Sequence, residues 1–435
     1  MGLALLLGLF VVYALFSRRL DHSSLTGPMI FTIAGVVTGL ILIARGGTAF
    51  DLALDVQSES VQILLEATLV IILFSDAVLI DARAVRREAF LPGRLLGIGL
   101  PLTIVAGTAI AMLVMPGLGF WPAAVIAVIL APTDAALGQA VVANEEVPGL
   151  VRQGLGVESG LNDGIAVPFL TIAVAGAANE MQNGSGIAAV FLEEIGLAIV
   201  VGLGIGWLGG RAVRFAFDRG WMSRGWRQVS VVFFALLCFA VADPIGGSGF
   251  IAAFVGGLTF GAQVRREYPD ICDFSEGVAH ILTMVAFLVF GAFILTPTLD
   301  VITWQIVLYA ILSLTVVRMI PVALSLIGTG LGGPTQVYIG WFGPRGLASL
   351  VFMGTVVVEA GPDEGSAIVA VAATTVGLSV LLHGLTAWPA SAKYAAWYLG
   401  TTEGMDADEM QAVVESKEVV HVPSSKLGGR LRKMM

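Results

Sequence analysis

The chain has 435 residues, of which 57% are hydrophobic and only 13% are charged, and its mean hydropathy is +0.91. A soluble domain carries about 25% charged residues, so this composition excludes an ordinary soluble protein and favours a chain that crosses a membrane many times. The net charge of −9 does not set an orientation, and two cysteines, Cys238 and Cys272, exclude a disulfide framework.

Membrane-spanning helices need about 20 mostly apolar residues each. Thirteen stretches of the sequence are candidates, of which the first, eighth and ninth are short: 2–16, 25–44, 60–80, 94–115, 120–142, 151–177, 186–216, 227–242, 248–262, 277–297, 303–328, 335–359 and 364–391. We therefore predict an all-α polytopic membrane domain over residues 1–395. Residues 396–435 are expected to form a largely disordered cytoplasmic tail.

The positive charges alternate between the predicted loops. Twenty of the 23 Lys and Arg residues fall in loops on one side or in the tail, and only Arg45 falls on the other side. Because cytoplasmic loops carry the excess of Lys and Arg, the pattern predicts an N-terminus outside and a C-terminus inside the plasma (inner) membrane.

An odd number of spans suggests two inverted six-helix repeats joined by one additional helix, which makes span five the counterpart of span twelve. Proline interrupts both, in Ala131-Pro132-Thr133-Asp134 and in Gly343-Pro344-Arg345-Gly346. Proline removes a backbone donor and clashes with the preceding turn, so each helix is expected to unwind there. Paired interruptions in corresponding helices indicate a transporter's substrate site, with the broken helices crossing at mid-membrane.

Span six contains a strongly polar segment, Glu158-Ser159-Gly160-Leu161-Asn162-Asp163-Gly164. Successive helical residues advance by about 100°, so four polar side chains share one face. They are Glu158, Ser159, Asn162 and Asp163. Charged groups at bilayer depth cost a few kcal/mol and mark ion or proton routes, so this face is expected to line an interior cavity.

Asp163 is the carboxylate that we expect to bind the transported species. Burial disfavours its charged form, whereas its ionised oxygens are hard ligands for a small cation. Proton and cation would therefore compete for Asp163.

Further groups could complete a cation shell around Asp163. Ser159 lies one helical turn away, and Thr133 and Asp134 lie at the interruption of span five. Asp76, in the inner half of span three, has no basic residue in its own helix and is a candidate ligand or gate.

Two mid-depth charges of opposite sign, Glu158 and Arg345, are expected to form an ion pair, because an unpaired buried arginine is very unfavourable. Arg318 also needs a partner, which the sequence does not name. His280 and His383 could relay protons, although a hydrogen-bonded structural role is the expected one.

These motifs resemble those of the electroneutral sodium–proton antiporters and exchangers within the monovalent cation–proton antiporter superfamily. The resemblance rests on the two interrupted segments and on the Glu158-to-Gly164 run, and with the thirteen-span layout it covers about residues 1–395. One departure is Gly343-Pro344-Arg345-Gly346, where relatives more often have Leu or a similar residue before the arginine.

The resemblance implies a homodimer in which a core domain moves against a dimerisation domain. It implies cation binding by the Asp163 carboxylate, the Ser159 hydroxyl and the Thr133 backbone, with Asp134 nearby. Asp76 matches a position often occupied by Glu in relatives.

The resemblance also gives roles to the remaining polar residues of the motifs. Asn162 is similar to the residue that marks electroneutral exchange, and Glu158 with Arg345 is similar to the family's structural ion pair.

The sequence thus predicts a secondary antiporter, not an enzyme, that exchanges Na⁺ or Li⁺ for H⁺ one for one, without a cofactor or a nucleic-acid partner. A K⁺/H⁺ antiporter is the alternative within transport. An intramembrane aspartyl protease with Asp134 and Asp163 as its dyad is another class, but Gly-x-Gly-Asp and Pro-Ala-Leu-Pro runs are absent from the sequence. A channel is a third class, against which the paired broken helices favour alternating access.

Overall fold

The computed structural model describes residues 2–20, 23–45, 59–80, 90–134, 137–138, 141, 147–177, 187–360 and 362–402. Within these ranges every regular element is helical, as predicted. Nine of the described helices are long and apolar enough to cross a membrane, and shorter apolar helices accompany them.

Each of the thirteen predicted spans coincides with one helix or a series of helices. The unbroken ones are α1 (Gly2–Leu20), α2 (Gly27–Ala44), α3 (Glu59–Leu79), α9 (Gly149–Ala177), α10 (Ile187–Asp218), α11 (Arg224–Ala242), α12 (Gly249–Val264) and α19 (Pro362–Thr402). Because α19 continues to Thr402, helix extends beyond the predicted domain end at residue 395. The remainder of the predicted tail lies outside the described residues.

The other spans are divided. Two contain a π-helical turn: α5 (Phe90–Arg94), η2 (Leu95–Gly99) and α6 (Leu100–Val114) form one, and α13 (Asp273–Val289), η4 (Phe290–Leu295) and α14 (Thr296–Thr298) form the other. The rest are α7 (Phe120–Ile129), α15 (Trp304–Leu314) with α16 (Val316–Ser325), and α17 (Gly333–Trp341) with α18 (Leu347–Ala360).

Side-chain caps fix several helix starts. In four helices a Ser or Thr hydroxyl accepts a hydrogen bond from the backbone N–H three residues later, which satisfies a donor that the helix leaves unpaired. The capping residues are Thr26, Ser223, Ser248 and Thr303.

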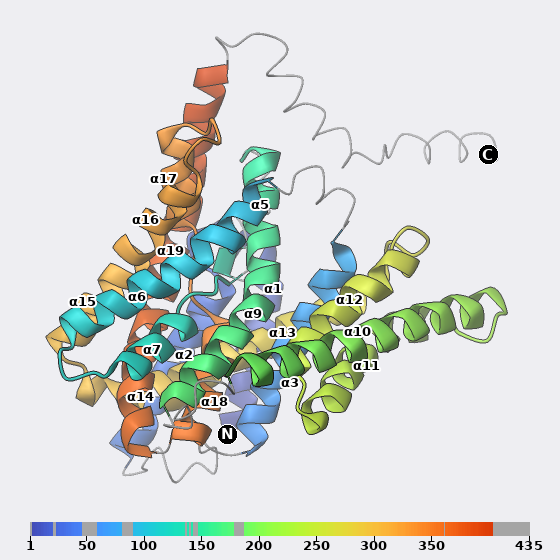
Figure 1. Ribbon diagram of the computed structural model, residues 1–435, viewed down its shortest axis with the longest axis horizontal. Coiled ribbons are helices and arrows are strands. Elements are labelled where there is room, and N and C mark those ends of the chain that lie inside the picture. Colours follow the sequence, from blue (N-terminus) through green and yellow to red (C-terminus); the bar gives the residue numbers. More distant parts are fainter. Residues whose placement is uncertain are drawn as a thin grey trace.

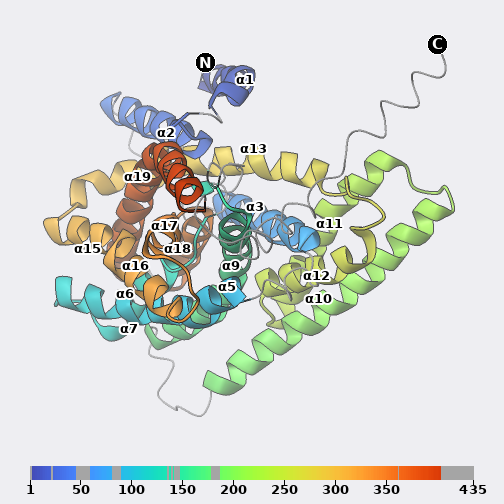
Figure 2. The same ribbon diagram turned by 90° about the horizontal axis from the view of Figure 1, so that it is seen from above.

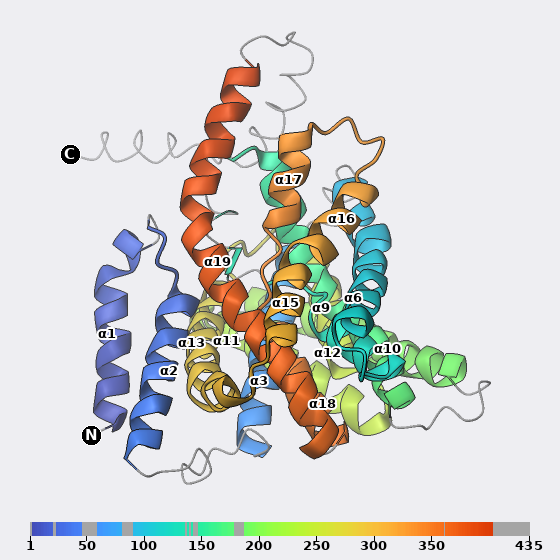
Figure 3. The same cartoon turned by 90° about the vertical axis from the view of Figure 1, so that its left-hand side faces the viewer.

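The helices pack in two groups joined by a common core (Figures 1 and 2). One group consists of α10, α11 and α12 with α3, and its tightest contact is between α10 and α12. There a Cβ on Gly202 or Gly206 would collide with backbone carbonyls of α12, so only glycine allows this approach. The other group contains α9, α16, α17 and α19. Figure 3 shows α1 and α2 together at one edge, where Phe10 packs on Phe31.

The interruptions of spans five and twelve face each other. The Asp134 N–H donates to the Pro344 carbonyl at 2.8 Å, and the Ser349 hydroxyl donates to the Ile129 carbonyl at 2.8 Å. The prediction that two broken helices meet is therefore confirmed. The backbone groups freed by each break find partners across the crossing.

Candidate functional site

The polar face of α9 points into the protein. Glu158, Asn162 and Asp163 are 2%, 1% and 8% exposed, and Ser159 is half-buried. Helices α3, α7, α12 and α18 all pack on α9. A buried polar face of this kind requires partners for its charges and hydrogen-bonding groups.

Thr133, in the interruption after α7, joins this face. Its hydroxyl oxygen accepts a hydrogen bond from Asn162 Nδ2 at 2.6 Å and lies 3.1 Å from Ser159 Oγ. The structure therefore brings together three of the residues that the sequence singled out.

Asp163 has an oxygen that no donor reaches. Among the described residues, no hydrogen-bond donor contacts Asp163 Oδ1, and the same holds for Asn162 Oδ1. Buried acceptors are normally satisfied, so each exception needs an explanation. Acceptors without donors, on a helix face that also carries the Ser159 hydroxyl, are suitable ligands for a hard cation.

Asp76 and Asp134 are the other carboxylates near Asp163, and both act on it electrostatically. Asp76, on α3, lies over Gly160 of α9, where an added Cβ would be 3.8 Å from Asp76 Oδ2. The structure thus places Asp76 one helical turn from Asp163 along α9.

Asp134 binds backbone groups with both oxygens. Its Oδ1 accepts from the Leu137 N–H at 2.8 Å, and its Oδ2 accepts from the Leu347 N–H at 2.5 Å. Leu347 begins α18, so Asp134 caps that helix from the opposite interruption. Its role as a cation ligand stays a prediction.

The predicted ion pair between Glu158 and Arg345 was wrong. Glu158 instead forms a bidentate pair with Arg318 of α16, with Nη1–Oε1 at 2.6 Å and Nη2–Oε2 at 2.8 Å. The sequence showed that Arg318 needed a partner, but it offered two arginines, Arg318 and Arg345, as partners for Glu158. In the structure Glu158 pairs with Arg318, whose guanidinium also fills the space beside Gly343.

Arg345 is fully buried and instead binds carbonyl groups that follow α7. Its Nη1 donates to the Ala131 and Pro132 carbonyls at 2.9 and 3.2 Å. A cation at a helix C-terminus is favourable, because the last carbonyls are unpaired and carry partial negative charge.

Other residues complete the crossing or lie apart from it. His383 is buried and hydrogen-bonded on α19, whereas His280 is exposed on α13. Ser349 and Ser379 also pair with the interrupted backbone. Neither serine was predicted from the sequence, because buried serines in apolar helices are common and carry no distinctive signal.

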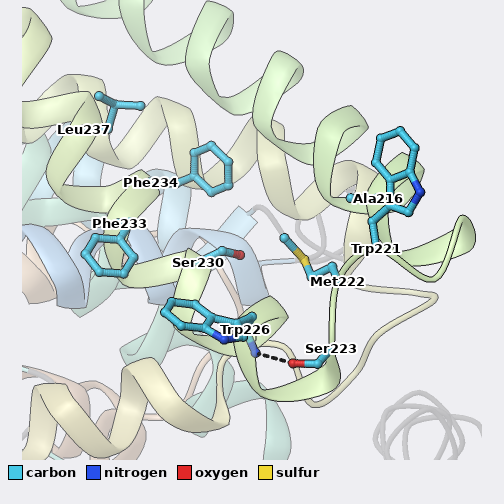
Figure 4. Close-up of a pocket in the computed structure, with 9 residues that line it drawn as sticks. All are labelled: Ala216, Trp221, Met222, Ser223, Trp226, Ser230, Phe233, Phe234 and Leu237. Atoms are coloured by element: carbon cyan, nitrogen blue, oxygen red, sulfur yellow. Dashed lines mark hydrogen bonds between the residues drawn. The ribbon is translucent and has the colours of Figure 1, made fainter.

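An apolar surface pocket of about 430 Å³ lies between the end of α10 and α11, lined by side chains such as Trp226, Phe233 and Phe234 (Figure 4). No residue of the polar crossing lines it. The pocket therefore does not belong to the candidate site.

An all-helical membrane protein whose two interrupted helices cross beside buried carboxylates has the architecture of a secondary transporter. The family described as "Sodium/hydrogen exchanger, transmembrane" matches residues 5–393, and the chain belongs to this family.

Individual relatives agree with this assignment. A probable Na⁺/H⁺ antiporter of Schizosaccharomyces pombe is 27% identical over 57% of this chain and 34% of its own length. The K⁺/H⁺ antiporter NhaP of Alkalimonas amylolytica is 25% identical over 96% of this chain and 70% of its own length. The chain thus spans about a third of the S. pombe protein and most of the bacterial one.

The structure is also similar to that of the sodium proton antiporter MjNhaP1 from Methanocaldococcus jannaschii. The TM-score is 0.73 at 21% identity, over 91% of this chain and 97% of that chain. At this identity the likeness shows a shared fold.

Proposed function

We propose that the protein is a secondary antiporter that exchanges Na⁺ or Li⁺ for H⁺, one for one, with both ions competing for Asp163. Membership of the sodium/hydrogen exchanger family supports the reaction class. The buried polar crossing supports the location of the site.

The main observation behind the proposal is that the buried Asp163 carboxylate has an oxygen, Oδ1, that no hydrogen-bond donor among the described residues reaches. A proton or a small cation would each satisfy that oxygen. The two cannot bind it fully at once, and this competition couples their movements.

The neighbouring groups favour a monovalent cation. Thr133, Ser159 and Asn162 supply neutral oxygens beside Asp163. Within the described ranges no cluster of three or more His, Cys, Asp or Glu residues is positioned to hold a metal ion. Ligand sets for divalent cations usually include several carboxylates bound to the ion, whereas here Asp163 would be joined by neutral oxygens, which suits Na⁺ or Li⁺.

Potassium–proton exchange is the second candidate. It is favoured by the K⁺/H⁺ antiporter of A. amylolytica, which matches nearly the whole chain. The aspartyl protease reading is disfavoured, because both Asp134 oxygens accept backbone N–H groups, as suits a carboxylate that caps a helix.

The cycle that we propose is alternating access within a homodimer in the plasma (inner) membrane, with the N-terminus outside and the tail cytoplasmic. The distribution of Lys and Arg supports the orientation. The group of α9, α16, α17 and α19 would move against the group of α3, α10, α11 and α12, carrying the site across.

Exchange by purified protein in proteoliposomes tests the proposal. Under an imposed pH gradient, we expect Na⁺ and Li⁺ to drive proton movement more strongly than K⁺. Asp163→Asn should abolish exchange while the protein still inserts and melts cooperatively. Asp300→Asn, which alters an exposed aspartate outside the site, is the matched control and should exchange as wild type does.

Two results would contradict this scheme. Wild-type exchange by Asp163→Asn would reject Asp163 as the shared site. A strict preference for K⁺ would replace sodium by potassium as the substrate.

A further inference from the structure

Two buried side chains of α19, Ser379 and His383, bind both ends of the interruption between α17 and α18. Each is at most 1% exposed, and they lie one helical turn apart. His383 Nε2 is 2.9 Å from the carbonyl oxygen of Trp341, the last residue of α17. Ser379 Oγ accepts the Arg345 N–H at 2.7 Å, just before α18 begins.

Both ring nitrogens of His383 face acceptors. Nε2 lies 2.9 Å from the Trp341 carbonyl, and Nδ1 lies 3.0 Å from both the carbonyl oxygen and the hydroxyl of Ser379. Because Ser379 Oγ accepts the Arg345 N–H, its own hydrogen is left to be donated. The imidazole therefore connects Ser379 with the end of α17 through its two nitrogens.

A series of hydrogen bonds continues from Arg345 to the candidate cation site. Arg345 Nη1 donates to the Ala131 and Pro132 carbonyls, and the next residue is Thr133. The Thr133 hydroxyl contacts Asn162 and Ser159 of α9. These links are hydrogen-bond contacts of 2.6–3.2 Å, so a displaced Arg345 backbone would move the carbonyls that precede Thr133.

We propose that Ser379 and His383 are positioning residues for the cation site: from α19 they hold the Trp341 carbonyl and the Arg345 N–H, and through Arg345 they fix the place of Thr133. This role rests on the proposed exchange at Asp163. Neither side chain touches the transported ion.

A comparison of apparent KM with maximal rate tests this role. Ser379→Ala removes the acceptor for Arg345, and His383→Phe removes both ring nitrogens at similar size. Each should raise the apparent KM for Na⁺ about fivefold, the factor expected for one ordinary hydrogen bond. The maximal rate should change less. His383→Gln keeps an N–H donor for the Trp341 carbonyl and should restore part of the affinity.

The matched control is Ser391→Ala. Ser391 is a buried serine of the same helix, and its hydroxyl lies 2.8 Å from the Tyr338 hydroxyl of α17, away from the interruption. It should lower the melting temperature as much as Ser379→Ala does while leaving KM unchanged.

A wild-type KM in Ser379→Ala, or an equal rise in KM in Ser391→Ala, would overturn the positioning role. If His383→Phe fails to insert, Ser379→Ala decides the question. Wild-type protein without any exchange would instead reject the proposed function, and this role would be rejected with it.

Discussion

At the scale of single residues, the buried charges of the crossing have different kinds of partner. Glu158 and Arg318 neutralise each other, and Arg345 lies against the carbonyl end of α7. Asp134 binds two backbone N–H groups. Asp163 alone among these five keeps a carboxylate oxygen without a donor. This difference supports the proposal that Asp163 is the group available for transport, whereas the other four hold the fold.

The Glu158–Arg318 pair should contribute strongly to stability. Glu158→Gln leaves the Arg318 charge buried without its counter-charge, which costs about 3–5 kcal/mol. Thermal unfolding in detergent should show a large loss. The control Glu267→Gln breaks a pair with Arg214 whose side chains are 45% and 46% exposed, and its loss should be below about 1 kcal/mol.

A second substitution checks which arginine is the partner. Replacing Arg318 by Met in the Glu158→Leu background should recover most of the lost stability, because an apolar pair can replace a buried ion pair. Recovery with Arg345→Met instead would identify Arg345 as the partner of Glu158, as expected from the sequence, and would contradict the Glu158–Arg318 pair.

The sequence identified the charged residues of the crossing correctly but not their pairing. Composition and spacing placed Glu158, Arg318 and Arg345 at bilayer depth, where each needs a partner. The choice between two arginines depends on the placement of α16 against α9, which is a tertiary contact without a local signal. The same holds for Asp134, whose backbone partner Leu347 lies in a distant helix.

At the scale of elements, the two interruptions stabilise each other. Arg345 and Ser349 bind carbonyls at the end of α7, and Asp134 binds the N–H at the start of α18. Prolines 132 and 344 predicted where the helices break, because the loss of an N–H is a local effect. They could not predict which backbone groups would pair across the crossing.

Gly346 is the residue that makes this arrangement possible. A Cβ there would overlap Oδ2 of Asp134, so Gly346→Ala would push the carboxylate off the Leu347 N–H. Losing such a cap costs about 1 kcal/mol, and the shift of the interruption should also slow exchange.

The measurements are the melting temperature and the exchange rate of Gly346→Ala. Gly354→Ala, also in α18, is the control: a Cβ there meets no atom within 4 Å, so neither quantity should fall. Equal behaviour of the two variants would mean that the contact between Asp134 and the Gly346 backbone is not required.

At the scale of the whole molecule, the order and extent of the spans were predictable. Each is a run of apolar residues, and the charged loops separate one from the next. The π-helical turn η4 was not predictable, because it forms where Gly35 of α2 and Gly291 approach each other closely. Such contacts between distant segments leave no periodicity in the sequence.

The charge that moves in one cycle is also a property of the whole molecule. If Asp163 alone changes its occupant, one H⁺ leaves for each Na⁺ that binds, and no net charge crosses the membrane. A potential of 100 mV is worth about 2.3 kcal/mol per charge moved, so an electrogenic cycle would respond strongly to it. Asn162 adds no charge at the adjacent position, and both Asp134 oxygens already accept backbone N–H groups. We therefore expect the initial rate of Na⁺/H⁺ exchange to be the same with and without a potassium diffusion potential imposed on proteoliposomes by valinomycin.

A clear dependence on the sign of the potential would reject one-for-one exchange. Asp76 would then be the first residue to examine, since it lies beside α9 one turn from Asp163, and Asp76→Asn should abolish that dependence.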